Sequence, residues 1–348
     1  MKKSIIFAKK ITTSFKATPK DYNLKTARTI LYLLLFLPLT VNAQDGESAF
    51  NFLRLPYSSR AAALGGSNIS VIGDDLSLSM HNPALLINVA DKTIDLSFMT
   101  YMSGSKVAGA AFNKHFGERS SGAVSLRFID YGKFDGYTDD NIYTGTFRAM
   151  DAELSIMYCY LLSDNWSGGV AGKFVYSQYE SMNSLALGVD LGLNYYNPDI
   201  DFSASLTFKN LGGQVKTFEQ KHELMPIDIQ LGFTKRLAHA PILLSATLVN
   251  LHKWSAKDFY NADGSEDNFG EILLKHIVLG ADVLIGKNFY ASVGYNYRLG
   301  RELSVSGRGF EGFSLGAGLH INKVKFGVSY SKLHISASSL LFNLAYSL

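Results

Sequence analysis

Apolar and polar residues alternate strictly along one stretch near the middle of the chain. Between positions 184 and 196, Leu, Val and Tyr occupy every second position, while Ala, Gly, Asp and Asn fill the positions between them. A period of two residues over this length predicts a β-strand with one apolar and one polar face. Asp190 and Asn194 on the second face argue against a strand buried in a parallel sheet, where both faces are apolar.

The same alternation recurs after Lys92 and predicts fourteen strands in all. Many of them exceed the ~5–6 residues that are usual for strands in soluble proteins, and they match the ~9–11 tilted residues that cross a bilayer. The predicted strands span residues 94–102, 106–115, 121–131, 146–161, 166–179, 184–196, 200–209, 227–237, 242–252, 275–285, 289–299, 310–321, 324–332 and 338–348.

The connections between these strands differ in length in a regular way. They are short after even-numbered strands, for example at 117–119 and 163–165. The long ones all follow odd-numbered strands, at 132–145, 210–226, 253–274 and 300–309. Short turns at one end and long loops at the other are typical of outer-membrane barrels, whereas a propeller would repeat its loops blade by blade. The sequence therefore predicts an all-β fold: a 14-stranded antiparallel transmembrane β-barrel, with lipid outside and a polar lumen.

The first 43 residues predict a signal peptide. Eight basic residues and one acid precede an uncharged run at 29–43 that ends in an A-x-A-like cleavage site. The apolar core, 30–39, is shorter than the ~20 residues of a spanning helix, which disfavours a membrane anchor. We expect residues 44–348 to reach the outer membrane, with both termini in the periplasm.

Removal of the leader changes the formal net charge from +3 to −4, because eight basic residues and one acid are lost. The basic character of the precursor therefore belongs largely to the leader, and we expect no nucleic-acid partner. The single cysteine, Cys159, cannot form an internal disulfide.

Residues 44–92 do not alternate. They contain a helix-like stretch at 59–64, a Gly65-Gly66 break and an Asn-Pro-Ala turn at 82–84. A moderately apolar segment of this size needs burial, and the interior of a fourteen-stranded barrel has room for it. We predict a plug at 44–92, inserted from the periplasmic end, and a barrel at 93–348. Charges of both signs on the lumen face are expected to pair with one another and with Arg54 and Arg60 of the plug; these are Arg127, Asp151, Glu153, Lys173, Asp190, Asp201 and Asp228.

Three runs in the plug region carry a family resemblance. L-R-L-P-Y-S-S-R-A-A-A-L at 53–64, the following G-G-S-N-I-S and H-N-P-A-L-L at 81–86 resemble the N-terminal signature of the PorQ family of the type IX secretion system. That family is found in the Bacteroidetes and belongs to the FadL-like outer-membrane group, which shares the Asn-Pro-Ala turn. The final Leu348 departs from the usual terminal Phe or Tyr. The motif residues are Leu55, Pro56, Arg60, Ala61, Gly65, Gly66, Asn82, Pro83 and Ala84.

The resemblance implies a non-enzymatic anchor. Its implied partner is a PorZ-like surface protein that joins PorU-like and PorV-like components in an attachment complex, which processes secreted cargo and links it to lipopolysaccharide. Long outer loops of mixed polarity are the candidate docking surface, represented by Tyr137, Tyr143, Gln214, Glu223, Lys257, Tyr260, Asp263, Asp267 and Glu271. The alternative is a FadL-like transporter of hydrophobic small molecules, against which the charged lumen argues mildly.

Motifs for catalysis and metal binding are incomplete. An S-x-x-K at 103–106 and an S-D-N at 163–165 resemble penicillin-binding enzymes, but the K-T-G element is missing and the two motifs fall at opposite barrel ends. Asn261, Asp263, Glu266 and Asp267 could bind calcium, but Glu271 misses the required EF-hand position, which favours a solvated acidic loop. We expect no enzyme activity, no cofactor and no metal.

Overall fold

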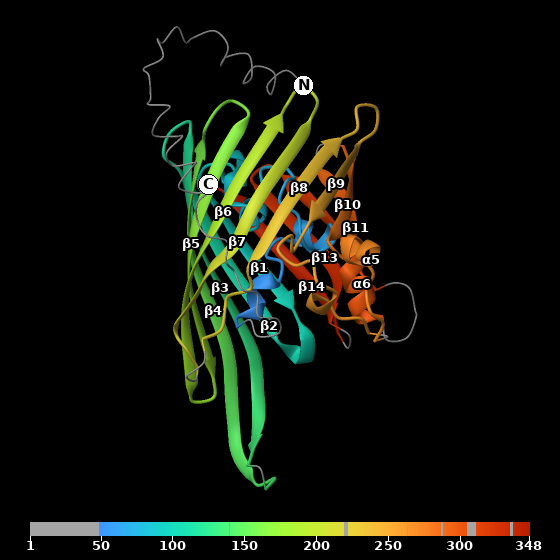
Figure 1. Ribbon diagram of the computed structural model, residues 1–348. Coiled ribbons are helices and arrows are strands. Elements are labelled where there is room, and N and C mark those ends of the chain that lie inside the picture. Colours follow the sequence, from blue (N-terminus) through green and yellow to red (C-terminus); the bar gives the residue numbers. More distant parts are fainter. Residues whose placement is uncertain are drawn as a thin grey trace, which may run out of the picture. The chain divides into compact units, whose positions relative to one another are not determined.

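In the described part of the chain, fourteen antiparallel strands close into a barrel, because β1 pairs with β2 on one side and with β14 on the other (Figure 1). Each strand that the alternation predicts is present, so the expected all-β, 14-stranded antiparallel barrel is confirmed. The strands are β1 Thr93–Thr100, β2 Lys106–His115, β3 Ser120–Tyr137, β4 Tyr143–Leu161, β5 Trp166–Tyr179, β6 Met182–Asn197, β7 Phe202–Lys216, β8 Asp228–Arg236, β9 Ile242–Leu248, β10 Ile277–Ile285, β11 Phe289–Asn296, β12 Phe313–Ile321, β13 Val324–His334 and β14 Ala337–Ser347.

This computed structural model describes residues 49–138, 140–218, 222–262, 264–286, 288–304, 311–334 and 337–348. The predicted signal peptide, residues 1–43, and residues 44–48 of the predicted plug lie outside the described residues. The described residues all belong to one compact unit, Asp45–Leu348. No helix among them is long and apolar enough to cross a membrane.

The outer face of the barrel wall is apolar and the inner face is polar. On β6, Leu187 is 53% exposed, whereas Asp190 and Asn194 on the alternate face are each 2% exposed. Leu126 on β3 and Leu344 on β14 are likewise exposed. An apolar band around the outside is the surface that a β-barrel presents to lipid, so the wall is of the outer-membrane type.

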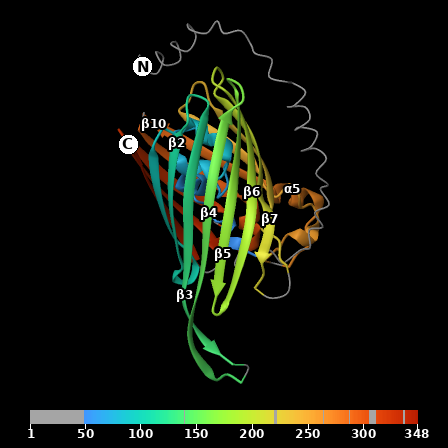
Figure 2. The same cartoon turned by 90° about the vertical axis from the view of Figure 1, so that its left-hand side faces the viewer.

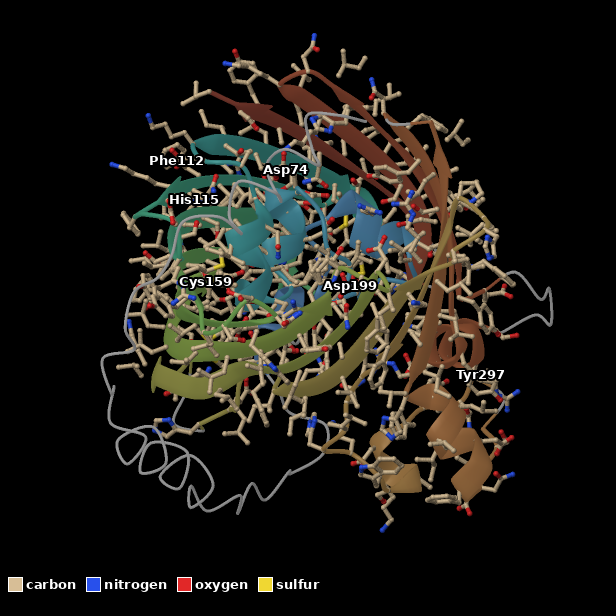
Figure 3. The ribbon with its side chains drawn as sticks, turned by 90° about the horizontal axis from the view of Figure 1, so that it is seen from above. Asp74, Phe112, His115, Cys159, Asp199 and Tyr297 are labelled. Atoms are coloured by element: carbon tan, nitrogen blue, oxygen red, sulfur yellow. The ribbon has the colours of Figure 1, made fainter. Side chains whose placement is uncertain are left out.

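Residues 49–92 fill the barrel lumen as a plug (Figure 3). Helix α3 contacts β11 to β14, and η2 contacts β3 to β6, so two sides of the wall hold the plug. Asn343 of β14 joins the plug to the β1–β14 seam: its side chain accepts the N–H of Ser59 at 2.6 Å and donates to Asp95 of β1 at 3.1 Å. The short helices of the plug are η1 Asn51–Arg54, α3 Ser59–Ala63, α4 Leu76–Ser79 and η2 Pro83–Asn88.

The plug runs along the lumen from one end of the barrel to the other. At the end with the long connections, the N–H of Ala49 donates to Leu224 in the β7–β8 connection at 3.2 Å. At the end with the short turns, the N–H of Leu348 donates to the carbonyl of Lys92 at 3.1 Å. Ala49 and Leu348 therefore lie at opposite ends of the barrel. Residues 44–48, at the predicted mature N-terminus, lie outside the described residues, so the prediction of periplasmic termini stays a prediction.

The long connections contain more regular structure than the sequence predicts. β3 extends to Tyr137 and β4 begins at Tyr143, so most of the predicted loop 132–145 is a two-stranded ribbon. β7 likewise continues to Lys216. Glycines at 132, 136 and 145 indicate a loop, but cross-strand pairing of the residues between them continues the strands beyond the barrel wall (Figure 2).

Two short helices were not expected from the hydrophobic pattern. α5, Phe269–Lys275, lies in the β9–β10 connection after the short η4, Ala256–Asp258, and α6, Tyr297–Leu303, replaces the last residues of the predicted strand 289–299. Asn268 and Glu271 cap α5 reciprocally, with both N–H to side-chain oxygen distances at 3.0 Å. This capping box is the sequence signal for the helix start.

Candidate functional site

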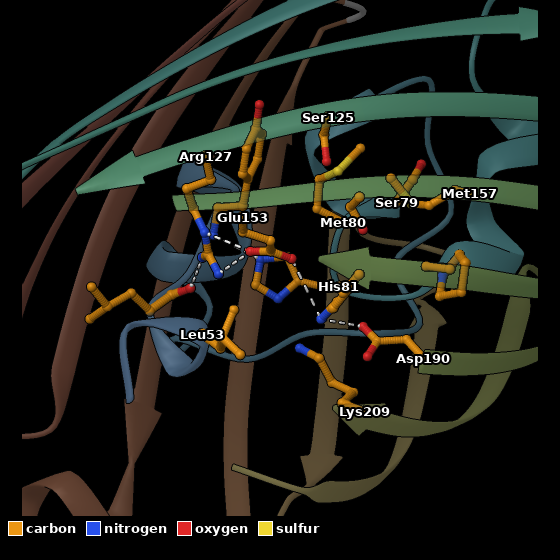
Figure 4. Close-up of a pocket in the computed structure, with 16 residues that line it drawn as sticks. Leu53, Ser79, Met80, His81, Ser125, Arg127, Glu153, Met157, Asp190 and Lys209 are labelled. Carbon is orange, nitrogen blue, oxygen red and sulfur yellow. Dashed lines mark hydrogen bonds and ion pairs between the residues drawn. The ribbon is translucent and has the colours of Figure 1, made fainter. Parts of the chain in front are cut away.

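A row of ion pairs crosses the inner wall from β3 to β6 (Figure 4). Arg127 donates from Nε and Nη2 to Glu153 Oε2 at 3.1 and 2.7 Å, and from Nη1 to the plug carbonyl of Leu55 at 2.9 Å. Lys173 Nζ lies 2.6 Å from Asp190 and 3.8 Å from Glu153. Because buried charges need partners, these four wall residues pair as predicted, and Arg127 also fastens the plug.

A second buried ion pair joins the plug to the opposite side of the wall. Arg60 of α3 donates from Nε and Nη2 to Asp282 Oδ2 on β10 at 3.0 and 2.6 Å. Its guanidinium lies over the ring of Tyr290 at 4.6 Å, and the hydroxyl of Ser292 also donates to Asp282. The plug is thus held to the wall by charge on both sides.

Other charges that the sequence predicts to form ion pairs use different partners. Asp151 accepts a hydrogen bond from the hydroxyl of Tyr131 at 2.6 Å. Asp228 accepts the N–H of Asn250 at 2.6 Å. Within the described residues, Arg54 forms no hydrogen bond or ion pair and faces a cavity instead.

The Asn-Pro-Ala turn of the family motif packs directly on the wall. Asn82 accepts the N–H of Ala84 at 3.0 Å and donates to the carbonyl of Ile69 at 2.8 Å. The carbonyl of Ala84 accepts the hydroxyl of Ser167 on β5 at 2.8 Å. Gly169 lies against Pro83 so closely that an added Cβ would come within 2.4 Å of the Pro83 carbonyl carbon. The turn therefore fixes the backbone of the plug.

The Gly65-Gly66 break also fixes the backbone of the plug against the wall. Gly65 and Gly66 have φ angles of 99° and 91°, which favour glycine. A Cβ on Gly294 of β11 would lie 2.1 Å from the nitrogen of Gly65, so plug and wall backbones are in direct contact. Pro56 and Ala61 are buried, and the carbonyl of Ala61 accepts the N–H of Gly66 at 3.0 Å. The motif residues thus lie together in the plug as packing and anchoring groups.

Three spaces in the lumen are each bordered by several charged side chains. A cavity of about 300 Å³ at the long-connection end borders Arg54, Lys209, Asp228 and Arg298. A smaller space of about 30 Å³ lies beside the ion-pair row (Figure 4). A third, of about 400 Å³ at the short-turn end, includes Lys325 and five other charged residues. Such linings suit water and ions better than hydrocarbon.

His81 of the plug borders the first two of these spaces. Its Nε2 accepts the N–H groups of Tyr57 and Ser58 at 3.2 and 3.4 Å. Burial, together with the nearby charges of Lys209, Arg127 and Lys173, lowers the pKa of His81 well below its usual range. A proton on Nε2 would abolish the acceptor for two backbone N–H groups.

The candidate docking residues fall on separate surfaces. Tyr137 and Tyr143 are exposed and form an edge-to-face ring pair, 5.7 Å between centroids, at the tip of the β3–β4 ribbon. Gln214 at the end of β7 accepts the N–H of Glu223 at 2.8 Å. Exposed Tyr260 lies in the β9–β10 connection. Lys257 lies in η4 and Glu271 in α5, and Asp263 lies outside the described residues.

The acidic part of the β9–β10 connection is solvated only in part: Glu266 is exposed, whereas the side chain of Asp267 is buried. The ammonium of Lys275, which is fully buried, lies 2.7 Å from Asn261 Oδ1 and 2.5 Å from Asp267 Oδ2. Asp267 is correspondingly buried and is not an exposed docking residue. Lys275 supplies a positive charge beside these oxygens. Among the described residues, no three His, Cys, Asp or Glu side chains lie together as a metal-binding group.

The two motifs that resemble penicillin-binding enzymes do not form a site. Ser103 lies in η3, Met102–Gly104, between β1 and β2, at the long-connection end. Ser163 lies in the β4–β5 turn at the other end. Cys159 is buried and donates weakly to the carbonyl of Ala84 at 3.4 Å, in keeping with a packing role.

Comparisons with known proteins identify the fold. No protein-family profile and no curated protein match the chain. The toluene transporter TbuX of Ralstonia pickettii matches at 12% identity and a TM-score of 0.52, over 85% of this chain and 98% of that chain. The toluene transporter TodX of Pseudomonas putida matches at 12% and 0.53, over 84% and 97%. A Pseudomonas aeruginosa FadL homologue matches at 10% and 0.47, over 83% and 98%. The chain thus shares the barrel fold of the two toluene transporters, TbuX and TodX.

Proposed function

We propose that this chain is a non-enzymatic scaffold in the outer membrane that holds a protein partner at the cell surface. The observation that carries the proposal is a set of exposed rings on the connections beyond the apolar wall, at the long-connection end. Clusters of exposed apolar side chains outside the membrane mark protein contact surfaces. The rings are those of Phe134, Tyr137, Tyr143, Trp254, Tyr260 and Phe269.

The filled lumen supports the same function. The plug is joined to the wall by the Arg60–Asp282 pair and by Arg127, and its backbone lies directly on wall glycines. Removing one member of a buried ion pair costs several kcal/mol, so a plug held in this way is a stable part of the barrel. A plug that is fixed in the lumen and surrounded by charged wall residues is consistent with a scaffold that does not open.

The resemblance to the PorQ family supports a more specific partner. On that ground we infer that the partner is a PorZ-like surface protein, in a complex with PorU-like and PorV-like components that attaches secreted cargo to lipopolysaccharide. The long-connection end would then face outward and the short turns the periplasm, as is usual for outer-membrane barrels.

The fold comparison favours a second candidate, the transport of small hydrophobic molecules. TbuX and TodX are both named as toluene transporters, and these comparisons bear on transport and not on secretion. The charged linings of the lumen cavities weigh against this candidate, because an apolar ligand gains little from a polar pocket.

Affinity purification of the tagged full chain from native outer membranes, followed by mass spectrometry, separates the two candidates. A scaffold retains a surface protein in stoichiometric amount, and Tyr137→Ser with Ile142→Ser reduces its recovery. Phe116→Ser with Leu162→Ser is the matched control, since these side chains at the short-turn end are 61% and 57% exposed, against 57% and 63% for the test pair. Toluene uptake into proteoliposomes without a retained partner would support the transporter.

A further inference from the structure

The β3–β4 ribbon has two open edges. Pairing between β2 and β3 ends at Lys106 and Asp130, and pairing between β5 and β4 ends at Tyr179 and Ala149. Beyond these points, apart from one hydrogen bond between Glu180 and Arg148, β3 and β4 pair only with each other (Figure 2). A free strand edge presents unpaired N–H and C=O groups, and a two-stranded ribbon is only marginally stable by itself.

The hydrogen bonds identify which groups on β4 point outward. The N–H of Glu180 donates to the carbonyl of Arg148 at 3.2 Å, so the backbone polar groups of Arg148 face away from β3. Such groups alternate in direction along an antiparallel strand. The register from Arg148 to Gly145 is unbroken, so Thr146 also points its N–H and C=O outward, while those of Phe147 point to β3.

The side chains along this edge differ on the two faces of the ribbon. On one face, the rings of Phe147 and Phe134 stack with centroids 5.5 Å apart. On the other, Arg148 lies directly opposite Lys133, and like charges opposite each other are destabilising. In the described part of the chain, neither cation forms an ion pair, although Asp135 shares their face. An acid supplied from outside the chain would relieve this repulsion.

We propose that the outer edge of β4 at residues 144–148 accepts an extended strand of the surface partner. The added strand would bond to the N–H and C=O of Thr146, place an acidic side chain beside Arg148, and cover Phe147 with an apolar one. Strand addition uses backbone hydrogen bonds for affinity and alternate side chains for selection. This inference rests on the proposed scaffold function and specifies how the partner is held.

The test uses the tagged full chain in native outer membranes and compares Thr146→Pro with Thr146→Val. Proline removes the outward N–H and places its ring at the edge, whereas valine keeps the N–H and loses only the hydroxyl. We expect Thr146→Pro to lower the co-purified surface protein at least about tenfold, and Thr146→Val to leave it within about twofold. Arg148→Glu should also lower recovery, and Arg148→Lys should retain it. Trypsin cleavage at Lys133 as slow in both Thr146 variants as in the unchanged protein verifies that the ribbon is folded.

The outcomes distinguish this inference from the function on which it rests. If the unchanged protein retains a surface protein and Thr146→Pro retains it equally well, the edge is not the docking site, and the scaffold function stands. If the unchanged protein retains none, the scaffold function fails. If Thr146→Pro instead abolishes a dimer of this chain in sedimentation analysis, the edge pairs with a second copy, which overturns the assignment to a partner strand.

Discussion

Replacing Arg60 by methionine removes the cation that neutralises a carboxylate buried in the barrel wall. The Arg60 side chain is 11% exposed, and that of Asp282 is fully buried. Breaking a buried pair on one side costs ~3–5 kcal/mol, because the remaining charge has lost its partner. The hydroxyl of Ser292 still donates to Asp282, so we expect the lower value. At ~1.4 kcal/mol for each factor of ten, this corresponds to roughly a 100-fold larger population of released plug.

Chymotrypsin cleavage within the plug of the folded barrel measures that population, provided that release and return are fast relative to cleavage. We expect Arg60→Met to be cut roughly 100-fold faster than the unchanged protein. Asp282→Leu in the same chain removes the unpaired charge and should restore most of the protection. Lys92→Met, which changes an exposed cation, is the control. A cleavage rate within about threefold of the unchanged protein, or a double variant no better than the single one, would refute the reasoning.

Three further predictions follow from the wall, the plug and the outer connections. Val189→Arg places a charge on the lipid face of β6 near mid-strand and should oppose folding into vesicles by ~2–4 kcal/mol, measured by urea titration; normal folding would contradict the lipid-facing assignment. The pKa of His81 is depressed in the folded protein, so the stability of the plug should be complete above about pH 6.5 and decline as the pH falls below that value. Chymotrypsin should therefore cut the plug faster at pH 5 than at pH 7.5, and His81→Gln should reduce the difference between the two rates. In the third variant, residues 257–271 are replaced by a short flexible linker, and Lys275→Met avoids an unpaired buried charge. We expect the partner to be lost on purification, while the barrel still shows the heat-dependent shift of a folded barrel on gels. Undiminished recovery of the partner would show that this connection is not the docking site.

The barrel wall was predictable because successive side chains on each strand face lipid and lumen in turn, and their polarity alternates accordingly. Leu187 faces lipid, and Asp190 faces the lumen, so alternation alone locates each strand. The ribbon at 132–145 was not predicted, because its glycines indicate a loop and its strand pairing becomes visible only when β3 and β4 are aligned. The seven-residue helices α5 and α6 are too short for a helical period to stand out.

The plug residues were identified by resemblance, but their uses depend on three-dimensional contacts. These contacts could not be predicted because the partners are far apart in sequence. Arg60 pairs with Asp282, 222 residues away, and no local sequence pattern indicates that partner. The same holds for Asp267, whose burial depends on Lys275. A lone acidic residue in a polar connection looks solvated until the buried cation beside it is known.

The position of Asn343 has a consequence for assembly. This residue is on the last strand to be synthesised, yet it hydrogen-bonds both to the plug at Ser59 and to the first strand at Asp95. Contacts between residues so distant in sequence form late in folding. The final zipping of the first and last strands therefore needs the plug already seated, since an empty lumen would leave the Asn343 amide partly unsatisfied at the seam. Insertion of the plug and pairing of β1 with β14 are therefore coupled, and the barrel closes around a plug that is already in the lumen.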